Sequence, residues 1–349
     1  MSAAPRSKPA VPDKAALLAL AKQMRRRKIA VIGDLVLDRY WVGRSSRISR
    51  EAPVLILEYE EERHVPGGAA NAALNVSALG GSPLVVGRLG GDTAGRALAQ
   101  ALRAYGLSTR WFFRDARGGT VVKTRILAGS RHAARQQIVR LDRGHTEPLS
   151  PATERALVRA ATAAVRSADA VLLSDYGYGV LSPVLRRSVI REAKLAGIPI
   201  VVDSRYALRG YRGATLLTPN EHEVMEALHL SSLGTTVLKR AGEQLVRGNG
   251  ARGVWITRGS DGMLLFERGA RPLTLSIVGS SDVADVTGAG DAVAAAAALA
   301  LAAGASQLLA AVVATYAASV VVMKRGTATV SAEELAEAIR AHAVPKVAS

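Results

Sequence analysis

Short apolar runs alternate with amphipathic stretches along most of the chain. Residues 28–33 (KIAVIG) form an apolar run that ends in Gly-Asp, which is typical of a buried parallel strand stopping at a loop. Further strands are expected at 84–87, 169–174, 198–203, 215–218 and 253–257, and helices at 93–105, 151–166, 182–196, 221–229 and 234–248. This alternation predicts an α/β fold with a mainly parallel central sheet that helices cover on both faces.

The end of the chain continues this pattern in a modified form. Residues 263–267 and 273–278 are expected to add an antiparallel edge to the sheet, and helices are expected at 290–303, 306–323 and 332–342. The main folded domain is expected to cover 28–342, with a tail over 343–349.

Three other strand-like runs have no helix between them. Residues 54–60, 120–128 and 136–141 alternate apolar and polar positions and are broken by glycine and charge. They predict a small β-rich lid built from about 42–64 and 110–142. Residues 1–27 are basic and are expected to form a leader that is disordered or holds a short helix over 13–24.

Composition removes several classes of protein. With 349 residues, 49% hydrophobic and 21% charged, the chain is not a disordered protein. It has no cysteine, which excludes a disulfide scaffold and agrees with a cytoplasmic location. The apolar stretch 292–323 is broken by Gly304, Ser306 and Gln307, so we expect two buried helices and no membrane insertion.

The net charge of +17 first suggests a nucleic-acid partner. Residues 1–28 and 110–143 each carry a net charge of +7, which leaves only +3 for the remainder. Because the charge is local and forms no continuous stripe, nucleic-acid binding is not expected as the main function.

The segment 285–291 (DVTGAGD) is the most informative motif. Small residues precede a helix whose first N–H groups and positive dipole end form an anion site. The amides of Gly288, Ala289 and Gly290 would hold a phosphate, and Asp291 would take a proton from an attacking hydroxyl. Alternatively, Asp291 only caps the helix.

Two further segments are candidates for binding a polyol. Gly67-Gly68 and Asn71 open a helix, where the glycines allow close approach and the amide offers a donor and an acceptor. Asp34 follows the first strand, at the edge where parallel sheets bind ligands. Each segment could instead be an ordinary turn before a helix.

Asn220 and Glu223 begin another helix, three residues apart. Their oxygens suit Mg²⁺ held through water, but the same spacing is that of a helix-capping pair.

The order of these motifs resembles that of the ribokinase-like (PfkB) sugar kinases. Within this family the chain is most similar to kinase domains that phosphorylate the anomeric hydroxyl of D-glycero-D-manno-heptose 7-phosphate. The similarity lies in 33–41 (GDLVLDRYW), 46–54 (SRISREAPV), 171–176 (VLLSDY), 211–220 (YRGATLLTPN) and 324–330 (KRGTATV).

The resemblance implies a kinase that uses ATP, Mg²⁺ and, in some members, K⁺. It implies Asp291 as the base, beside the amides of the glycine turn, and Asn220 and Glu223 as the residues that organise Mg²⁺ and the nucleotide. It assigns sugar binding to Asp34, Gly67, Gly68 and Asn71, nucleotide binding to Thr257, Gly259, Gly262 and Thr287, and a monovalent cation to Asp285 with Thr287.

A phosphorylated sugar also needs cations. Arg47, Lys123, Arg125 and Arg205 come from the predicted lid and nearby loops, although each could be a solvated surface charge. Two positions depart from the heptose kinase pattern: Tyr178 replaces a lysine, and Thr315 stands where an asparagine often lies near adenine.

The alternatives are a PfkB kinase for a ketohexose phosphate, ribose or a nucleoside, and a silent paralogue that binds sugar phosphate. The exposed edges of the lid strands favour a homodimer.

Overall fold

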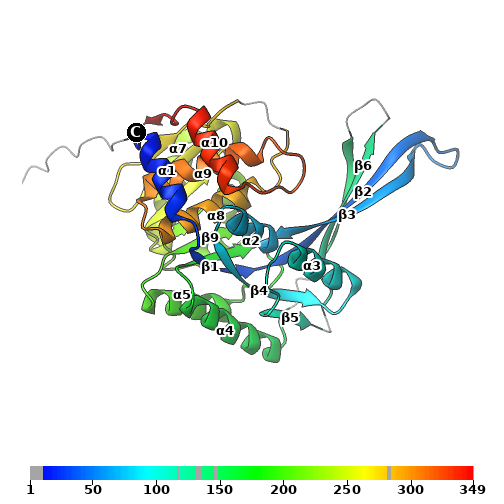
Figure 1. Cartoon of the computed structure of the whole chain (residues 1–349), viewed down its shortest axis with the longest axis horizontal. Coiled ribbons are helices and arrows are strands. Elements are labelled where there is room, and N and C mark those ends of the chain that lie inside the picture. The colour runs from blue at the N-terminus through cyan, green and yellow to red at the C-terminus, as the bar shows by residue number, and fades with distance from the viewer. Residues whose placement is uncertain (1–10, 116–117, 130–134, 145–147, 281–283, 349) are drawn as a thin grey trace, which may run out of the picture.

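A ten-stranded sheet forms the centre of the computed structural model, which describes residues 11–115, 118–129, 135–144, 148–280 and 284–348 (Figure 1). Its strands lie in the order β14 (Val347–Ala348), β13 (Leu273–Leu275), β12 (Met263–Glu267), β11 (Gly253–Thr257), β10 (Leu216–Leu217), β9 (Ile200–Ser204), β8 (Ala170–Asp175), β1 (Lys28–Gly33), β4 (Ser82–Gly90) and β5 (Phe112–Asp115). The strands from β11 to β5 pair in parallel, and β12, β13 and β14 add an antiparallel edge.

Helices cover both faces of this sheet, because the side chains of each central strand point alternately to two apolar cores. In β1, Ile29 and Val31 join one core, and Ala30 and Ile32 join the other. The first core is covered by α1 (Lys14–Gln23), α2 (Ala69–Ala78), α3 (Thr93–Ala104), α8 (Ala289–Ala302), α9 (Gln307–Val321) and α10 (Ala332–Ala341). The second is covered by α4 (Pro151–Arg166), α5 (Pro183–Leu195), α6 (Glu221–Leu228) and α7 (Thr235–Asn249). The predicted fold class is confirmed.

A four-stranded sheet projects from one end of the body as the lid (Figure 1). Its order is β3 (Leu55–Gly68), β2 (Leu35–Ile48), β6 (Val121–Gly129) and β7 (Gln136–Arg143). β2 was not predicted as a strand. It begins two residues after β1 ends, so the chain runs from the main sheet straight into the lid.

The predicted lid boundary at residue 110 is wrong for β5. Phe112–Asp115 pairs in parallel with β4 in the main sheet, so the second lid segment begins with β6. β5 has only four residues and, among the described residues, no helix separates it from β6, which is why the sequence did not assign the two strands to different sheets.

The ends of the chain are attached to the body. A helix is present where one was predicted over 13–24, and its Leu17 and Leu20 are buried in the first core. Arg25, just after α1, also pairs with Glu333 in the first turn of α10 at 2.9 Å. The predicted boundary at residue 28 therefore does not separate α1 from the folded body. Residues 347–348 of the predicted tail form β14.

α8 is the helix that fixes the position of the central motif. All residues from Asp291 to Ala300 are buried, and most of them are alanines, so α2 and α9 pack closely against it. Among the described helices, none has both the length and the hydropathy to cross a membrane.

The packing of α1 is testable by a leucine truncation. Leu17→Ala removes a side chain with 0% exposure and is expected to lower the free energy of unfolding by about 2–5 kcal/mol. Leu195→Ala, at a position on α5 that is 78% exposed, is the control and should change it by less than about 0.5 kcal/mol. Urea denaturation measures both. Equal small effects would show that α1 is not part of the cooperative core.

Candidate active site

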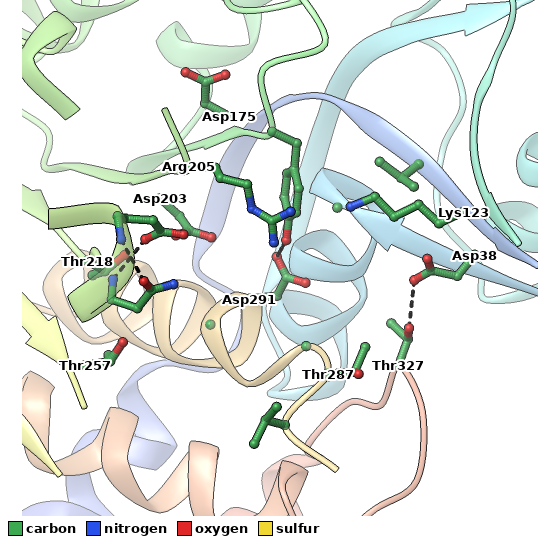
Figure 2. Close-up of a pocket in the computed structure, with 18 of the residues that line it drawn as sticks. Asp38, Lys123, Asp175, Asp203, Arg205, Thr218, Thr257, Thr287, Asp291 and Thr327 are labelled. Atoms are coloured by element: carbon green, nitrogen blue, oxygen red, sulfur yellow. Dashed lines mark hydrogen bonds between the residues drawn. The ribbon is translucent and has the colours of Figure 1, made fainter. Parts of the chain in front are cut away.

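Asp291 lies in the first turn of α8, with 4% of its surface exposed. Its carboxylate accepts hydrogen bonds from Asn71 Nδ2 at 2.7 Å and from the Tyr176 hydroxyl at 3.0 Å. Asn71 comes from α2 and Tyr176 follows β8, so three separate parts of the chain fix this one acid. Figure 2 shows Asp291 among the side chains that line one cavity.

Burial raises the pKa of Asp291 from 3.8 to about 6, while the hydrogen bonds from Asn71 and Tyr176 act to lower it. The carboxylate is therefore ionised at neutral pH and is a stronger proton acceptor than an exposed aspartate. This pKa suits a general base that removes a proton from an alcohol.

The turn before α8 faces the same cavity. Gly288 has a left-handed φ of 84°, and a Cβ there would lie 2.9 Å from Asn71 Nδ2. Gly288 and Gly290 line the cavity beside Asp291. The Ala289 N–H donates to Val286 O at 3.2 Å, which corrects the prediction of three free amides in this turn.

Two connected cavities, each of about 350 Å³, meet at this turn. Asn220, Thr257, Val286 and Gly290 line both. The polar cavity holds Asp291 and the charged side chains, and the second is walled by Met263, Ile277, Val278, Val293 and Val322. The site thus combines a charged compartment with an apolar one.

The prediction for Asp34 needs correction. Asp34 is 1% exposed, and its carboxylate accepts the N–H groups of Tyr176, Tyr178 and Val180 at 2.9–3.1 Å. It does not line the polar cavity, so it positions the 176–180 loop.

Asp38, the next acid along the chain, does line the polar cavity, and sequence reasoning missed it. It accepts a hydrogen bond from the Thr327 hydroxyl at 2.7 Å and pairs with Arg125 at 2.5 Å. The signal was the continuation of the chain as β2, which carries the next acid into the site.

Gly67 and Gly68 end β3 beside these acids. A Cβ on Gly67 would lie 2.5 Å from Asp38 Oδ2. Gly68 has a left-handed φ of 58°, and a Cβ there would lie 2.6 Å from the backbone oxygen of Asp34. Gly68 lines the cavity. Of the predicted sugar-binding residues, Gly67 and Asn71 act behind the cavity wall.

The four predicted cations separate into groups. Three of them line the polar cavity: Lys123, Arg125 and Arg205. Arg47 is exposed near the outer end of β2 and does not line the cavity, so its predicted contact with the substrate is wrong. Arg140 of β7 also lines it but was not predicted; it pairs with Asp142.

Lys123 and Arg205 reach toward the space above Asp291 from opposite sides (Figure 2). Lys123 Nζ lies 5.0 Å and Arg205 Cζ 5.2 Å from the ring centre of Tyr176. Lys123 Nζ is also 5.9 Å from the ring centre of Tyr178. Tyr178 is the residue that replaces the lysine of the heptose kinase pattern. Burial and the charge of Arg205 lower the pKa of Lys123.

Asn220 and Glu223 form a capping box at the start of α6. The Glu223 N–H donates to Asn220 Oδ1, and the Asn220 N–H donates to Glu223 Oε2, both at 2.9 Å. Both residues also line the polar cavity. The same two residues therefore cap the helix and face the candidate site.

The acids near α6 provide the chemistry for a divalent cation. Burial raises the pKa of Glu223 to about 7, and burial together with the charges of Glu223 and Asp291 raises the pKa of Asp203. Mg²⁺ usually takes one or two protein carboxylates, substrate phosphates and water. Asp203 and Glu223 fit this role, because a cation beside them would offset their mutual repulsion. Among the described residues, no group of three or more His, Asp or Glu forms a complete metal cage.

The other predicted nucleotide residues lie around the apolar cavity. Gly259, Gly262 and Thr315 line it, and Thr257 lies where the two cavities join. Thr287 lines the polar cavity, and its N–H and hydroxyl both donate to Asp285 Oδ1. Asp285 Oδ2 accepts the Gly326 N–H, so Asp285 holds two loops together.

Residues 26–335 match the pfkB family of carbohydrate kinases. The chain belongs to this family. Its curated relatives include bifunctional protein HldE of Azorhizobium caulinodans, with 44% identity over 313 residues, covering 89% of this chain and 64% of the relative. Bifunctional protein HldE of Gluconobacter oxydans is 40% identical, covering 88% of this chain and 63% of the relative. This chain therefore spans just under two thirds of the relatives' length.

Solved structures show the same fold. The ribokinase of Arabidopsis thaliana, complexed with ribose and ATP, has a TM-score of 0.70 and 22% identity over 90% of this chain and 99% of that one. Phosphofructokinase-2 from Escherichia coli, in complex with potassium, has a TM-score of 0.71 and 19% identity over 90% and 98%. The fold is ribokinase-like, and the family identifies the chain as a phosphotransferase with an alcohol group as acceptor.

The bond from Tyr176 to Asp291 makes a prediction about pH. The carboxylate must be ionised to accept a proton, so kcat/KM for the carbohydrate should fall as the pH drops through about 6. Tyr176→Phe keeps the ring between Lys123 and Arg205 but removes a hydrogen bond that lowers this pKa. The acid limb should then move to higher pH, by about one unit. A pH–rate profile measures this, and an unchanged acid limb would contradict the role of Tyr176.

Proposed function

We propose that this kinase transfers the γ-phosphate of ATP to the anomeric hydroxyl of a sugar that already carries a phosphate, D-glycero-D-manno-heptose 7-phosphate. The similarity to the relatives named bifunctional protein HldE and the sequence motifs support this substrate. The observation that carries the proposal is the pair of cations that face each other across Tyr176.

Lys123 and Arg205 distinguish this cavity from one built for a neutral sugar. Arg125 and Arg140 pair with Asp38 and Asp142, whereas neither Lys123 nor Arg205 forms an ion pair among the described residues. Burial is the main cause of the lowered pKa of Lys123, and repulsion by the charge of Arg205 adds to it. A phosphate group within reach of both would offset that repulsion and accept hydrogen bonds from both.

The reaction follows from the position of Asp291. As the sugar hydroxyl oxygen forms its bond to the γ-phosphorus, the bond from that phosphorus to the bridging oxygen of ADP breaks, and Asp291 takes the hydroxyl proton. The start of α8 would stabilise the negative charge on the transferring group. Asn71 and Tyr176 would hold the carboxylate in the orientation that accepts the proton.

The apolar cavity suits the adenine base of ATP. Val278, Val293 and Val322 would contact its faces, and Gly259 and Gly262 leave room for it beside β11. Asn220 and Thr257, where the cavities meet, would contact the phosphates.

Two ions complete the proposal. Asp203 and Glu223 would hold Mg²⁺, which supplies positive charge beside the phosphates when it is bound. A monovalent cation at Asp285 with Thr287 stays a prediction, because both Asp285 oxygens already accept bonds from Thr287 and Gly326.

A homodimer through the lid is also proposed. β3 and β7 are the free edges of the lid sheet, and Leu55, Ile138 and Leu141 on them are about half exposed. Pairing of two lids would cover these edges. Sedimentation velocity distinguishes the dimer from the monomer.

A substrate panel tests the function. ADP release should be most efficient, as kcat/KM, with the heptose 7-phosphate, and lower with fructose 6-phosphate, ribose and a nucleoside. A higher value for any of these three would identify a different PfkB kinase, and binding of sugar phosphate without ADP release would identify a silent paralogue.

Arg205→Met links the panel to the site. Loss of a charged hydrogen bond of about 1.5–3 kcal/mol should raise KM for the phosphorylated sugar roughly ten- to a hundredfold, with little effect on an unphosphorylated one. Arg47→Met, at the exposed end of β2, makes the same chemical change outside the cavity and should leave KM unchanged. Equal effects on both kinds of sugar would contradict the assignment of Arg205 to phosphate.

A further inference from the structure

A separate cavity of about 610 Å³ lies against α5, on the face of the main sheet opposite α1 and α10 (Figure 1). α5 and the segment 208–212 form its walls. Within the described part of the chain, no carboxylate lines this cavity. Six cations line it: Arg186, Arg187, Arg191, Lys194, Arg209 and Arg212. The mechanism proposed above uses none of them.

Within the described part of the chain, none of the six cations forms an ion pair with an aspartate or a glutamate. Such pairs do occur elsewhere on the surface, for example between Arg166 of α4 and Glu192 of α5. Like charges that share one cavity repel each other. The cluster therefore has a strong positive potential that an anion would neutralise.

One wall of the cavity is rigid. Arg186 Nε donates to Leu181 O at 2.6 Å, and its guanidinium lies 5.0 Å from the ring centre of Tyr211. Tyr211 is fully buried, and its hydroxyl donates to Asp175 Oδ2 at 2.6 Å. Arg186 is thus held in place before any ligand arrives, which lowers the entropic cost of binding.

Two glycines bring the walls together. A Cβ on Gly210 would lie 2.4 Å from a terminal nitrogen of Arg186, and a Cβ on Gly213 would lie 2.1 Å from Lys194 Nζ. Arg186 and Lys194, two of the four α5 cations in the cavity, therefore lie directly against the bare backbone of the segment that carries Arg209 and Arg212. The close approach makes charges from two elements converge on one space.

We propose that this basic cavity binds a small molecule that carries two or more phosphate groups. Arginine contacts phosphate oxygens through two N–H groups at once. Six cations distributed around the cavity match a ligand with several phosphate groups better than a ligand with a single phosphate. Pro183 and Ile190 add an apolar wall for the organic part of the ligand. The volume is that of a small-molecule site, which favours such a ligand over a polymer.

Pyrophosphate titration by calorimetry tests this proposal on the full chain. The wild type should bind one pyrophosphate here in addition to any bound in the active site. Arg187→Glu with Arg191→Glu reverses two exposed charges, one turn apart on α5, and should weaken that site at least tenfold. Because both residues lie outside the active site, ADP release without added pyrophosphate should be unchanged.

Arg155→Glu with Arg159→Glu is the matched control. It makes the same charge change at the same spacing on exposed positions of α4, outside the cavity, and should keep both sites. The same number of bound pyrophosphates in all three proteins would overturn the proposal, as would an equal loss in both double variants. Binding of a DNA oligonucleotide through Arg187 and Arg191, with no pyrophosphate site there, would also overturn it and identify a nucleic-acid surface.

Discussion

The site depends on one carboxylate kept ionised inside the protein. Asp291 is almost fully buried, and this burial raises its pKa from 3.8 to about 6. Hydrogen bonds from Asn71 and Tyr176 and the positive end of α8 oppose that rise. The result is a base that is charged but poorly solvated, and the elements that carry its two donors must pack accurately for it to work.

The lid is tied to the same region by a second polar network. Asp38 on β2 pairs with Arg125 on β6 and accepts a bond from Thr327, whose N–H donates to the Tyr40 hydroxyl at 3.1 Å. The neighbouring Gly326 donates to Asp285, just before the turn into α8. The lid strands and the anion-binding turn therefore share one set of contacts, which explains how residues from both sheets meet in a single cavity.

The sequence predicted those parts of the site whose geometry is local. In 285–291 and 220–223 the turn, the helix start and the side chain are a few residues apart, so the motif defines its own shape. Asp34 and Arg47 were assigned wrongly, because which side chain of a continuing strand reaches the cavity depends on the twist and register of β2. Tyr176 was missed for a related reason: its bond to Asp291 joins residues 115 positions apart. The packing of α1 could not be predicted either, since Leu17 and Leu20 enter a core built by residues far away in the sequence.

Single-turnover phosphoryl transfer in Asp291→Asn tests the central claim most directly. The substitution keeps the shape of the side chain but removes the group that accepts the proton. The account predicts that transfer slows by about 10²–10⁴-fold, while the affinities for ATP and for the sugar and the cooperative thermal transition stay close to those of the wild type. A rate within tenfold of the wild type, in a protein that still binds both substrates, would contradict the role of Asp291 as the base.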